Sequence, residues 1–460
     1  MIHAAALFRG INYTATAVGI AVAISCNYVL LNMLGFNQGE LHVRSLLAAP
    51  LEILLATGLM IVVISPFLEL ASLYPGSPGV RTYTKKSLGE MPSMLVTFSY
   101  LGILLLIAGI ESSLLLSILT SFIPAPTALT LLALTLVSVI VINLLGIQSS
   151  ERFQRAATAL LWFGSMALCW LAYLYSPVQS ISNVLPVPSE PETSSVFVVW
   201  LQQLSLHNVA LGIFLFIGIE LAATTVRQPS DLHRILPRAT LAAVTLIAVL
   251  YTSMAFVLPV IAQPQQTSDN ALLWFSSALA SHHWTFIALF LLILALLTSF
   301  NAGLRGASRM VYMLGREGRL SRRMTRLGSD GITPVNAVAA VGLLALLSSL
   351  ATITLDLTRL LSELAAAIIC VVYAALLIAS CRNIQRKQLV PEFFNSSVPL
   401  SLRWLLAALF LMLGGVSVFQ LMRDTAGSIL VATIVIGLIS LTCFSTSRAD
   451  LQPAINNQSN

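Results

Sequence analysis

Residues 211–239 read LGIFLFIGIELAATTVRQPSDLHRILPRA, and this stretch decides the fold. It begins as an apolar helix, carries Gly218 and Glu220 at depth, and leaves through a short basic loop into another apolar segment. A charge in a membrane span costs about 2.5–3.5 kcal/mol on insertion scales and is kept where it faces a cavity, a partner or a solute. Because glycine does not stabilise a helix, backbone freedom or the close approach of another group are the candidate reasons for Gly218. We therefore expect a membrane helix that opens near the midplane, where backbone groups can meet a solute.

The composition of the whole chain is that of an integral membrane protein. Of its 460 residues, 9% are charged and 57% are hydrophobic, and the mean hydropathy is +0.90. Soluble domains carry roughly 25% charged residues. Apolar runs of about 18 or more residues predict membrane helices, and twelve such runs lie at 12–36, 46–74, 93–122, 125–147, 153–175, 206–226, 239–262, 284–312, 334–355, 358–381, 402–422 and 426–446.

The distribution of basic residues predicts the orientation of these spans. With both termini in the cytoplasm, 21 of the 24 lysines and arginines fall inside, and only Arg44, Arg359 and Arg423 fall outside. Cytoplasmic loops carry such an excess in membrane proteins. The net charge of +6 is therefore an orientation signal and not a nucleic-acid surface.

Cysteines and histidines show no pattern of a metal, cofactor or enzyme site. The five cysteines lie in or at the ends of spans without paired spacing, which favours packing over disulfides. The histidines are scattered at loops and span edges, with no Ser/His/Asp grouping in the spans. We expect no enzyme activity, no cofactor and no metal cluster. The cysteines are Cys26, Cys169, Cys370, Cys381 and Cys443.

Several spans carry polar residues that allow two interpretations. Ser25, Cys26 and Asn27 could contact a solute or make interhelical hydrogen bonds. Glu111 could carry a proton or bind a cationic group, or it could be a protonated acid in a packed interface. Glu69, near the inner end of its span, is more typical of a structural partner for a loop arginine.

The adjacent hydroxyls of Thr298 and Ser299 also have two interpretations. They could ligate a sodium ion, which prefers oxygen ligands, or bond back to the preceding turn of their own helix. We favour the second.

Four groups of segments in register resemble the amino acid-polyamine-organocation superfamily of transporters across roughly residues 45–340. Each group has residue types that this superfamily has at the same point: a span end and its turn, the exit from helix four, helix six with its basic loop, and the run before helix nine. The segments are FLELASLYPGSPGVRTYTKKSLG (67–89), NLLGIQSSERFQ (143–154), FIGIE (216–220) with VRQPSDLHRILPRA (226–239), and SRMVYMLGREGRLSRRMTRL (308–327) with TPVNAV (333–338).

The resemblance implies an all-α leucine-transporter fold. It places a ten-helix core at 1–382 with inverted repeats at roughly 12–175 and 206–382, two accessory helices at 383–446, and a polar cytoplasmic tail at 447–460. Helices 1 and 6 would be unwound at the midplane, where half-helix N-termini meet a carboxylate and free carbonyls accept from an ammonium. The implied substrate-binding residues are Ser25, Cys26, Asn27, Ile217, Gly218, Ile219 and Glu220.

Three departures from the superfamily pattern bear on function. The glycine-rich break of helix 1 has its nearest equivalent at 24–28, which lacks glycine, and Ile219 stands where a gating aromatic is common. Helix 5 has no lysine, so the proton route that some members use is absent. The remaining candidates for coupling are Glu111, Glu220, Thr298 and Ser299.

These observations predict a secondary active transporter of the plasma (inner) membrane. It would move an amino acid or related small amine by alternating access, either coupled to H+ or Na+ or by exchange. A non-transporting receptor or assembly partner that keeps the permease fold is the alternative, since helix 1 lacks the glycines. The oligomeric state is left open.

Overall fold

A computed structural model of the chain describes residues 2–35, 48–74, 79–175, 204–224, 226, 230–261, 270–279, 282–383 and 394–458. Helices make up the regular structure of these residues, which contain no strand. In chain order they are α1 (Ile2–Ala21), α2 (Ile24–Leu34), α3 (Ala48–Leu73), α4 (Val80–Leu88), α5 (Glu90–Thr120), α6 (Ala125–Leu144), α7 (Ile147–Tyr175), α9 (Leu206–Phe214), α10 (Leu221–Thr224), α11 (Asp231–Ile261), α12 (Ala271–Ala278), α13 (His282–Arg316), η2 (Arg322–Thr325), α14 (Val335–Leu355), α15 (Thr358–Arg382), α16 (Leu400–Leu421) and α17 (Thr425–Gln458).

The helices agree with the predicted spans. Within the described residues, ten helices are long and apolar enough to cross a membrane, and the bent pair α1–α2 makes an eleventh crossing. The helices α9 and α10 occupy the position of the predicted sixth span, so the arrangement is compatible with twelve crossings. Parts of the predicted loops, including 75–78, 176–203 and 262–269, lie outside the described residues.

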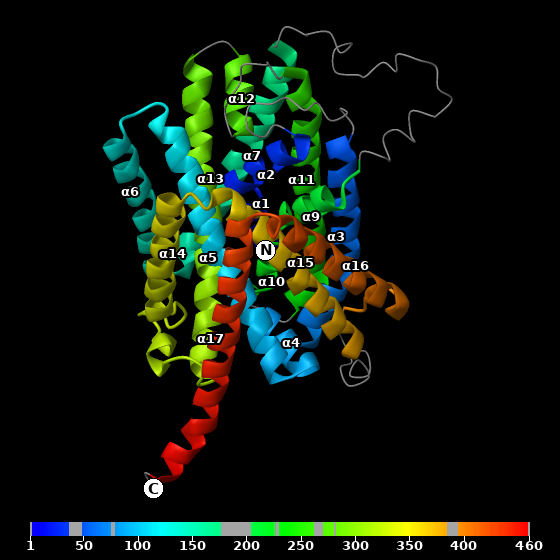
Figure 1. The fold of residues 1–460 in the computed structure, drawn as a ribbon, viewed down its shortest axis with the longest axis vertical. Coiled ribbons are helices and arrows are strands. Elements are labelled where there is room, and N and C mark those ends of the chain that lie inside the picture. The colour runs from blue at the N-terminus through cyan, green and yellow to red at the C-terminus, as the bar shows by residue number, and fades with distance from the viewer. Residues whose placement is uncertain are drawn as a thin grey trace.

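Four helices at the ends of the bundle differ from the prediction. A short helix, α4, follows the second span at one end of the bundle, and α12 lies at the opposite end (Figure 1). Helix α11 begins at Asp231, eight residues before the predicted 239, and an acidic residue there stabilises the positive end of the helix dipole. Helix α17 continues to Gln458 and so includes most of the predicted polar tail.

The broken helices lie inside the bundle. In Figure 1, α1, α2, α9 and α10 are in the middle, with α6 and α14 on one side and α16 on the other. Among the continuous spans, α15 and α13 are the most buried, with 78% and 72% of their apolar windows inside the protein, whereas α17 has 11%. The core therefore surrounds the two interrupted segments, and α17 faces outward.

An ion-pair cluster fixes α4 to the ends of α5 and α13. Arg81 contacts Glu317 at 2.8 Å and also pairs with Glu90, and Lys85 contacts Glu317 at 2.9 Å. Burial acts to raise the pKa of Glu317, but the hydrogen bonds from Arg81 and Lys85 outweigh it and hold the pKa below its ordinary value. The arginine-rich end of the bundle is thus held together by paired charges.

Glu69 has the structural role that its position predicts, with a different partner. Its two carboxylate oxygens accept hydrogen bonds from the Arg403 guanidinium at 2.9 and 3.1 Å, and both side chains are buried. Arg403 lies in the first turn of α16 and not in the loop that follows α3. The pair therefore joins α3 to α16.

Candidate functional site

The first span is interrupted at Val22 and Ala23. Helices α1 and α2 meet there at a bend of 54°, and Ala23 has an extended backbone, with φ −70° and ψ 162°. The Tyr251 hydroxyl donates to the Ala21 carbonyl at 2.6 Å, and the Asn27 amide donates to the Ala23 carbonyl at 3.0 Å. The carbonyl of the last residue before the break thus has a partner on another helix, whereas the Ala23 carbonyl accepts from both the N–H and the side chain of Asn27.

This break lies slightly earlier than the predicted segment 24–28. Ser25, Cys26 and Asn27 belong to the first turn of α2 and are not unwound. The break uses no glycine, and the carbonyl just before it, that of Ala21, is bound by a side chain from α11.

The second interruption separates α9 from α10. Residues 215–220 form turns in place of a helix, and Gly218 has φ +99°, a conformation that residues with a side chain rarely adopt. Hydrogen bonds of the tighter i to i−3 type begin the interruption, such as that from the Ile217 N–H to the Phe214 carbonyl at 3.1 Å. All four predicted residues of this segment, from Ile217 to Glu220, lie in the interruption.

The two breaks face one another. A Cβ atom built on Gly218 would lie 2.8 Å from the Ile20 Cβ, closer than real Cβ atoms come, and 3.1 Å from the Ile20 Cδ1. Ile20 lies just before the first break, in the last turn of α1. Gly218 therefore serves both purposes that the sequence allowed, namely a left-handed backbone and close approach of another helix.

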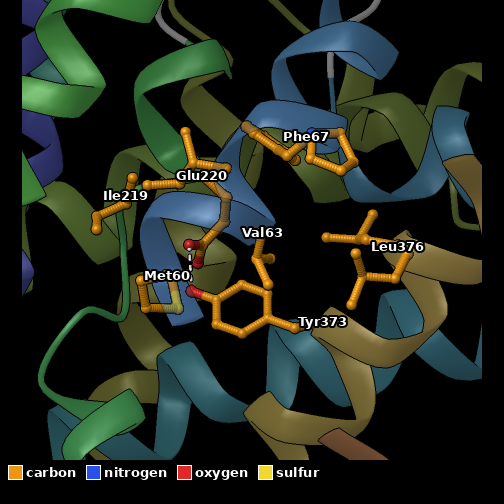
Figure 2. A pocket seen from close by; sticks show the side chains of 10 residues that line it. Met60, Val63, Phe67, Ile219, Glu220, Tyr373 and Leu376 are labelled. Atoms are coloured by element: carbon orange, nitrogen blue, oxygen red, sulfur yellow. Dashed lines mark hydrogen bonds between the residues drawn. The ribbon is translucent and has the colours of Figure 1, made fainter. Parts of the chain in front are cut away.

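Glu220 is held by two tyrosines and by the backbone of its own break. The Tyr100 hydroxyl from α5 donates to Glu220 Oε1, the Tyr373 hydroxyl from α15 donates to Oε2 at 2.8 Å, and the Gly218 N–H donates to Oε1 at 3.2 Å. Figure 2 shows the carboxylate beside Tyr373 in a cavity walled by α3 and α15. This cavity has a volume of about 10 Å³, room for about one water molecule.

Glu111 makes a second, separate cluster with two of the other predicted residues. It is fully buried, and it accepts hydrogen bonds from the Ser25 hydroxyl of α2 at 3.2 Å and from the Ser299 hydroxyl of α13. No lysine or arginine of the described residues forms an ion pair with Glu111. This carboxyl group therefore links the turn after the first break to the eighth span through hydroxyls alone.

The two clusters contact α5 at different points along its length. Tyr100, which holds Glu220, and Glu111 are both on α5, eleven residues apart. With a rise of 1.5 Å per residue, their positions on the helix axis are separated by about 16 Å. The structure thus divides the predicted site residues into one group around Glu111 and another around Glu220.

The remaining candidates have local partners. The Thr298 hydroxyl donates to the Ala295 carbonyl at 2.9 Å, and Ser299 also donates to the Leu296 carbonyl at 3.2 Å. These are the bonds to the preceding turn that we favoured for the pair. Ser299 also contacts the Glu111 carboxyl group. Cys26 makes a weak contact from its sulfur to the Ile20 carbonyl at 3.9 Å.

Sequence reasoning did not identify three buried residues whose side chains make hydrogen bonds between separate segments of the bundle. Tyr251 and Tyr373 are lone tyrosines in apolar helices, and a buried tyrosine hydroxyl usually has a partner, which is the signal that could have found them. Asn301 on α13 accepts from Asn143 and Ser150, each at 2.8 Å. Its amide also donates to the Gln154 side chain on α7 at 2.6 Å, so Asn301 ties together α6, α7 and α13.

Comparison with known proteins settles the family. A model of the family described as "Amino acid permease" matches residues 13–440, nearly the whole chain. The chain belongs to the amino acid permease family. The gamma-aminobutyric acid permease of Escherichia coli (strain K12) is similar to this permease, with 25% identity over 317 residues. That match covers 64% of this chain and 65% of the length of that relative.

Solved structures of transporters share the fold of this permease. A mutant of the manganese transporter of Eremococcus coleocola aligns with a TM-score of 0.59 and 13% identity, over 97% of this chain and 95% of that one. A Na+-coupled sialic acid symporter in a substrate-bound outward-open state aligns with a TM-score of 0.55 and 11% identity, over 89% and 88%. These likenesses show the fold alone. The chain is a multi-pass integral membrane protein with the leucine-transporter fold.

Proposed function

We propose that this permease moves an amino acid or a related small amine across the membrane by alternating access. The observation that carries the proposal is the meeting of the two breaks at Ile20 and Gly218. Interrupted helices expose peptide groups at depth, and these groups can bind both ends of a small zwitterion. The family and the similarity to a gamma-aminobutyric acid permease support this class of solute.

The N-terminus of α2 is the proposed site for the carboxylate of the solute. This helix begins at Ile24 without a side-chain cap, so the N–H groups of its first turn, including those of Ser25 and Cys26, point toward the break. The positive end of the helix dipole there favours an anion.

The amine of the solute is proposed to bind next to Asn27. Its side chain is buried, its nitrogen donates to the Ala23 carbonyl at the break, and its oxygen has no hydrogen-bond partner in the described part of the chain. A buried acceptor of this kind is suited to a donor from a ligand.

Proton coupling at Glu111 is the proposed energy source. Its carboxyl group is buried between the first turn of α2 and α13, and among the described residues it is bound by the hydroxyls of Ser25 and Ser299. Protonation removes a charge from this apolar position, and deprotonation restores it, so the charge state of Glu111 can bias the position of α2. Glu220 is proposed to fix the shape of the second break, since its oxygens are already taken by two tyrosines and the Gly218 N–H.

Uptake into proteoliposomes tests the transport proposal. We expect one or more of a panel of labelled amino acids and amines to accumulate under an inward proton gradient and to exchange against unlabelled solute. A sodium gradient that drives uptake without a proton gradient would move the coupling to Na+. Failure of every solute to be moved, or to compete, under any gradient would contradict the function.

The matched pair Glu111→Gln and Glu363→Gln tests the coupling residue. Glu363 is a half-buried carboxylate on α15, 4.0 Å from Arg359. We expect Glu111→Gln to abolish gradient-driven accumulation while solute exchange persists, and Glu363→Gln to preserve both. Accumulation by Glu111→Gln at the level of wild type would assign coupling elsewhere and leave the transport proposal standing.

The wider organisation of the chain is proposed as the sequence predicts it. Residues 1–382 would form the transport core with repeats at 12–175 and 206–382, and residues 383–446 would form two accessory helices. Both termini would lie on the cytoplasmic side of the plasma membrane. Reporter fusions at the C-terminus test the orientation. The alternative of a non-transporting receptor was motivated by the lack of glycine in helix 1, and that argument is weakened because the helix breaks without glycine.

A further inference from the structure

A large groove lies outside the transport site, between the inner half of α1 and helices α7 and α11. Its volume is about 930 Å³, which is the size of a site for a large ligand. The mouth is basic, whereas the deeper wall is apolar and includes Val18, Trp162 and Leu246. Phe163 and Leu7, on its sides, are 67% and 66% exposed, so the groove opens toward the surface that a bilayer would cover.

Four arginines and one aspartate make up the charge of the groove: Arg9 on α1, Arg155 on α7, and Arg234, Arg238 and Asp231 on α11. The aspartate is buried and already paired with Arg9 at 2.9 Å. Arg234 and Arg238 are exposed and have no ion pair or hydrogen bond with any described residue. The mouth therefore has uncompensated positive charge that can bind an anion.

The depth of the groove matches the length scale of a phospholipid. Arg155 and Trp162 are seven residues apart on α7, and Arg238 and Leu246 are eight apart on α11. The apolar wall is thus about 10–12 Å deeper than the arginines along each helix. A head group at the mouth would place its acyl chain against this wall. The bias of basic residues assigns the mouth to the cytoplasmic side, where basic pockets between membrane helices bind anionic lipid head groups.

We propose that this groove binds one anionic phospholipid, with its phosphate at Arg234 and Arg238 and an acyl chain beside Trp162. Such a lipid touches α1, α7 and α11 at once, so it holds the inner half of α1 against α11, the next long span after the second break. Anionic lipid would then favour the arrangement in which α1 packs on α11.

Quenching of Trp162 fluorescence by brominated lipids tests the proposal. The full chain is reconstituted in phosphatidylcholine with a minor fraction of brominated phosphatidylglycerol or of brominated phosphatidylcholine, and the signal of Trp162 is isolated by comparison with Trp162→Phe. We expect stronger quenching by the brominated phosphatidylglycerol. In the variant Arg234→Gln/Arg238→Gln this preference should fall by about 5-fold for each arginine, or roughly 30-fold for the pair.

The control removes two arginines on the same side of the membrane but outside the groove. Arg322 and Arg323 are exposed and adjacent, and Arg322→Gln/Arg323→Gln changes the net charge equally. We expect this control to keep the preference. Equal quenching by the two lipids in the wild-type protein, an unchanged preference in Arg234→Gln/Arg238→Gln, or an equal loss in the control would overturn the proposal.

Discussion

Substitution of Gly218 by alanine tests whether the two helix breaks are in contact. The added methyl group has two unfavourable consequences, because the residue has φ +99° and because Ile20 occupies the space. A left-handed backbone costs a residue with a side chain roughly 1–2 kcal/mol, and overpacking of a filled core costs about 1–3 kcal/mol. We therefore expect Gly218→Ala to destabilise the protein by about 2–5 kcal/mol and to reduce solute exchange strongly.

A neighbouring substitution and a matched control make the test specific. Gly303→Ala is the control, because a Cβ at Gly303 meets no atom within 4 Å and this glycine lies inside the continuous helix α13. Ile20→Ala removes the Cγ1 and Cδ1 atoms at 3.2 and 3.1 Å but leaves the Cβ at 2.8 Å, so it should rescue Gly218→Ala only in part.

Thermal unfolding in detergent, followed by solute exchange in proteoliposomes, measures the two effects. Gly218→Ala should have a lower melting temperature than both the wild type and Gly303→Ala. If Gly218→Ala and Gly303→Ala are equal in melting temperature and in exchange, then the breaks do not touch in the membrane, and the argument that they form one solute site fails.

Three further predictions concern the charged and polar contacts around the site. Glu69→Gln should destabilise the protein by about 3–5 kcal/mol, measured by thermal unfolding, because it leaves Arg403 as an uncompensated buried charge; stability equal to wild type would show that the pair is not buried. Because folding lowers the pKa of Glu317, the stability from its ion pairs is complete above the ordinary pKa of 4.5 and is lost as the pH falls below it; thermal unfolding of Glu317→Gln should therefore be less sensitive to acid than that of the wild type. Tyr373→Phe should cost about 1–3 kcal/mol because a buried oxygen of Glu220 loses its donor, and a cycle with Glu220→Gln that is simply additive would contradict the contact.

The spans and the second break could be predicted because each depends on short stretches of sequence. Apolar length and the bias of basic residues define the crossings, and a glycine beside a carboxylate in an apolar helix indicates an interruption. Ser25, Glu111 and Ser299 were each identified singly, but their meeting could not be predicted. Ser25 and Glu111 are 86 residues apart in the sequence, and Glu111 and Ser299 are 188 apart. Only the packing of α2, α5 and α13 brings them together.

The sequence could not show which side chains of other helices contact the first break and Glu220. The segment 24–28 was expected to be the first break from its likeness to a glycine-rich motif, yet the interruption is at Val22 and Ala23. The carbonyl of Ala21, just before it, accepts from Tyr251, which is 230 residues away in the sequence. Likewise, the sequence predicted that Glu220 contacts the solute, but in the structure its carboxylate oxygens accept hydrogen bonds from Tyr100 and Tyr373.

A break held by side chains behaves differently from one that glycines permit. Glycine makes many backbone conformations accessible, so a glycine-rich break can change its backbone conformation without a change in its contacts to other helices. Here the carbonyl of Ala21 depends on the Tyr251 hydroxyl of α11, and the first turn after the break depends on Glu111 of α5 through Ser25. If α1 and α11 shift relative to one another, the bond between Tyr251 and Ala21 must stretch or exchange partners. The geometry of the proposed solute site is therefore coupled to the packing of α1 on α11, and this is the same packing that an anionic lipid in the groove would stabilise.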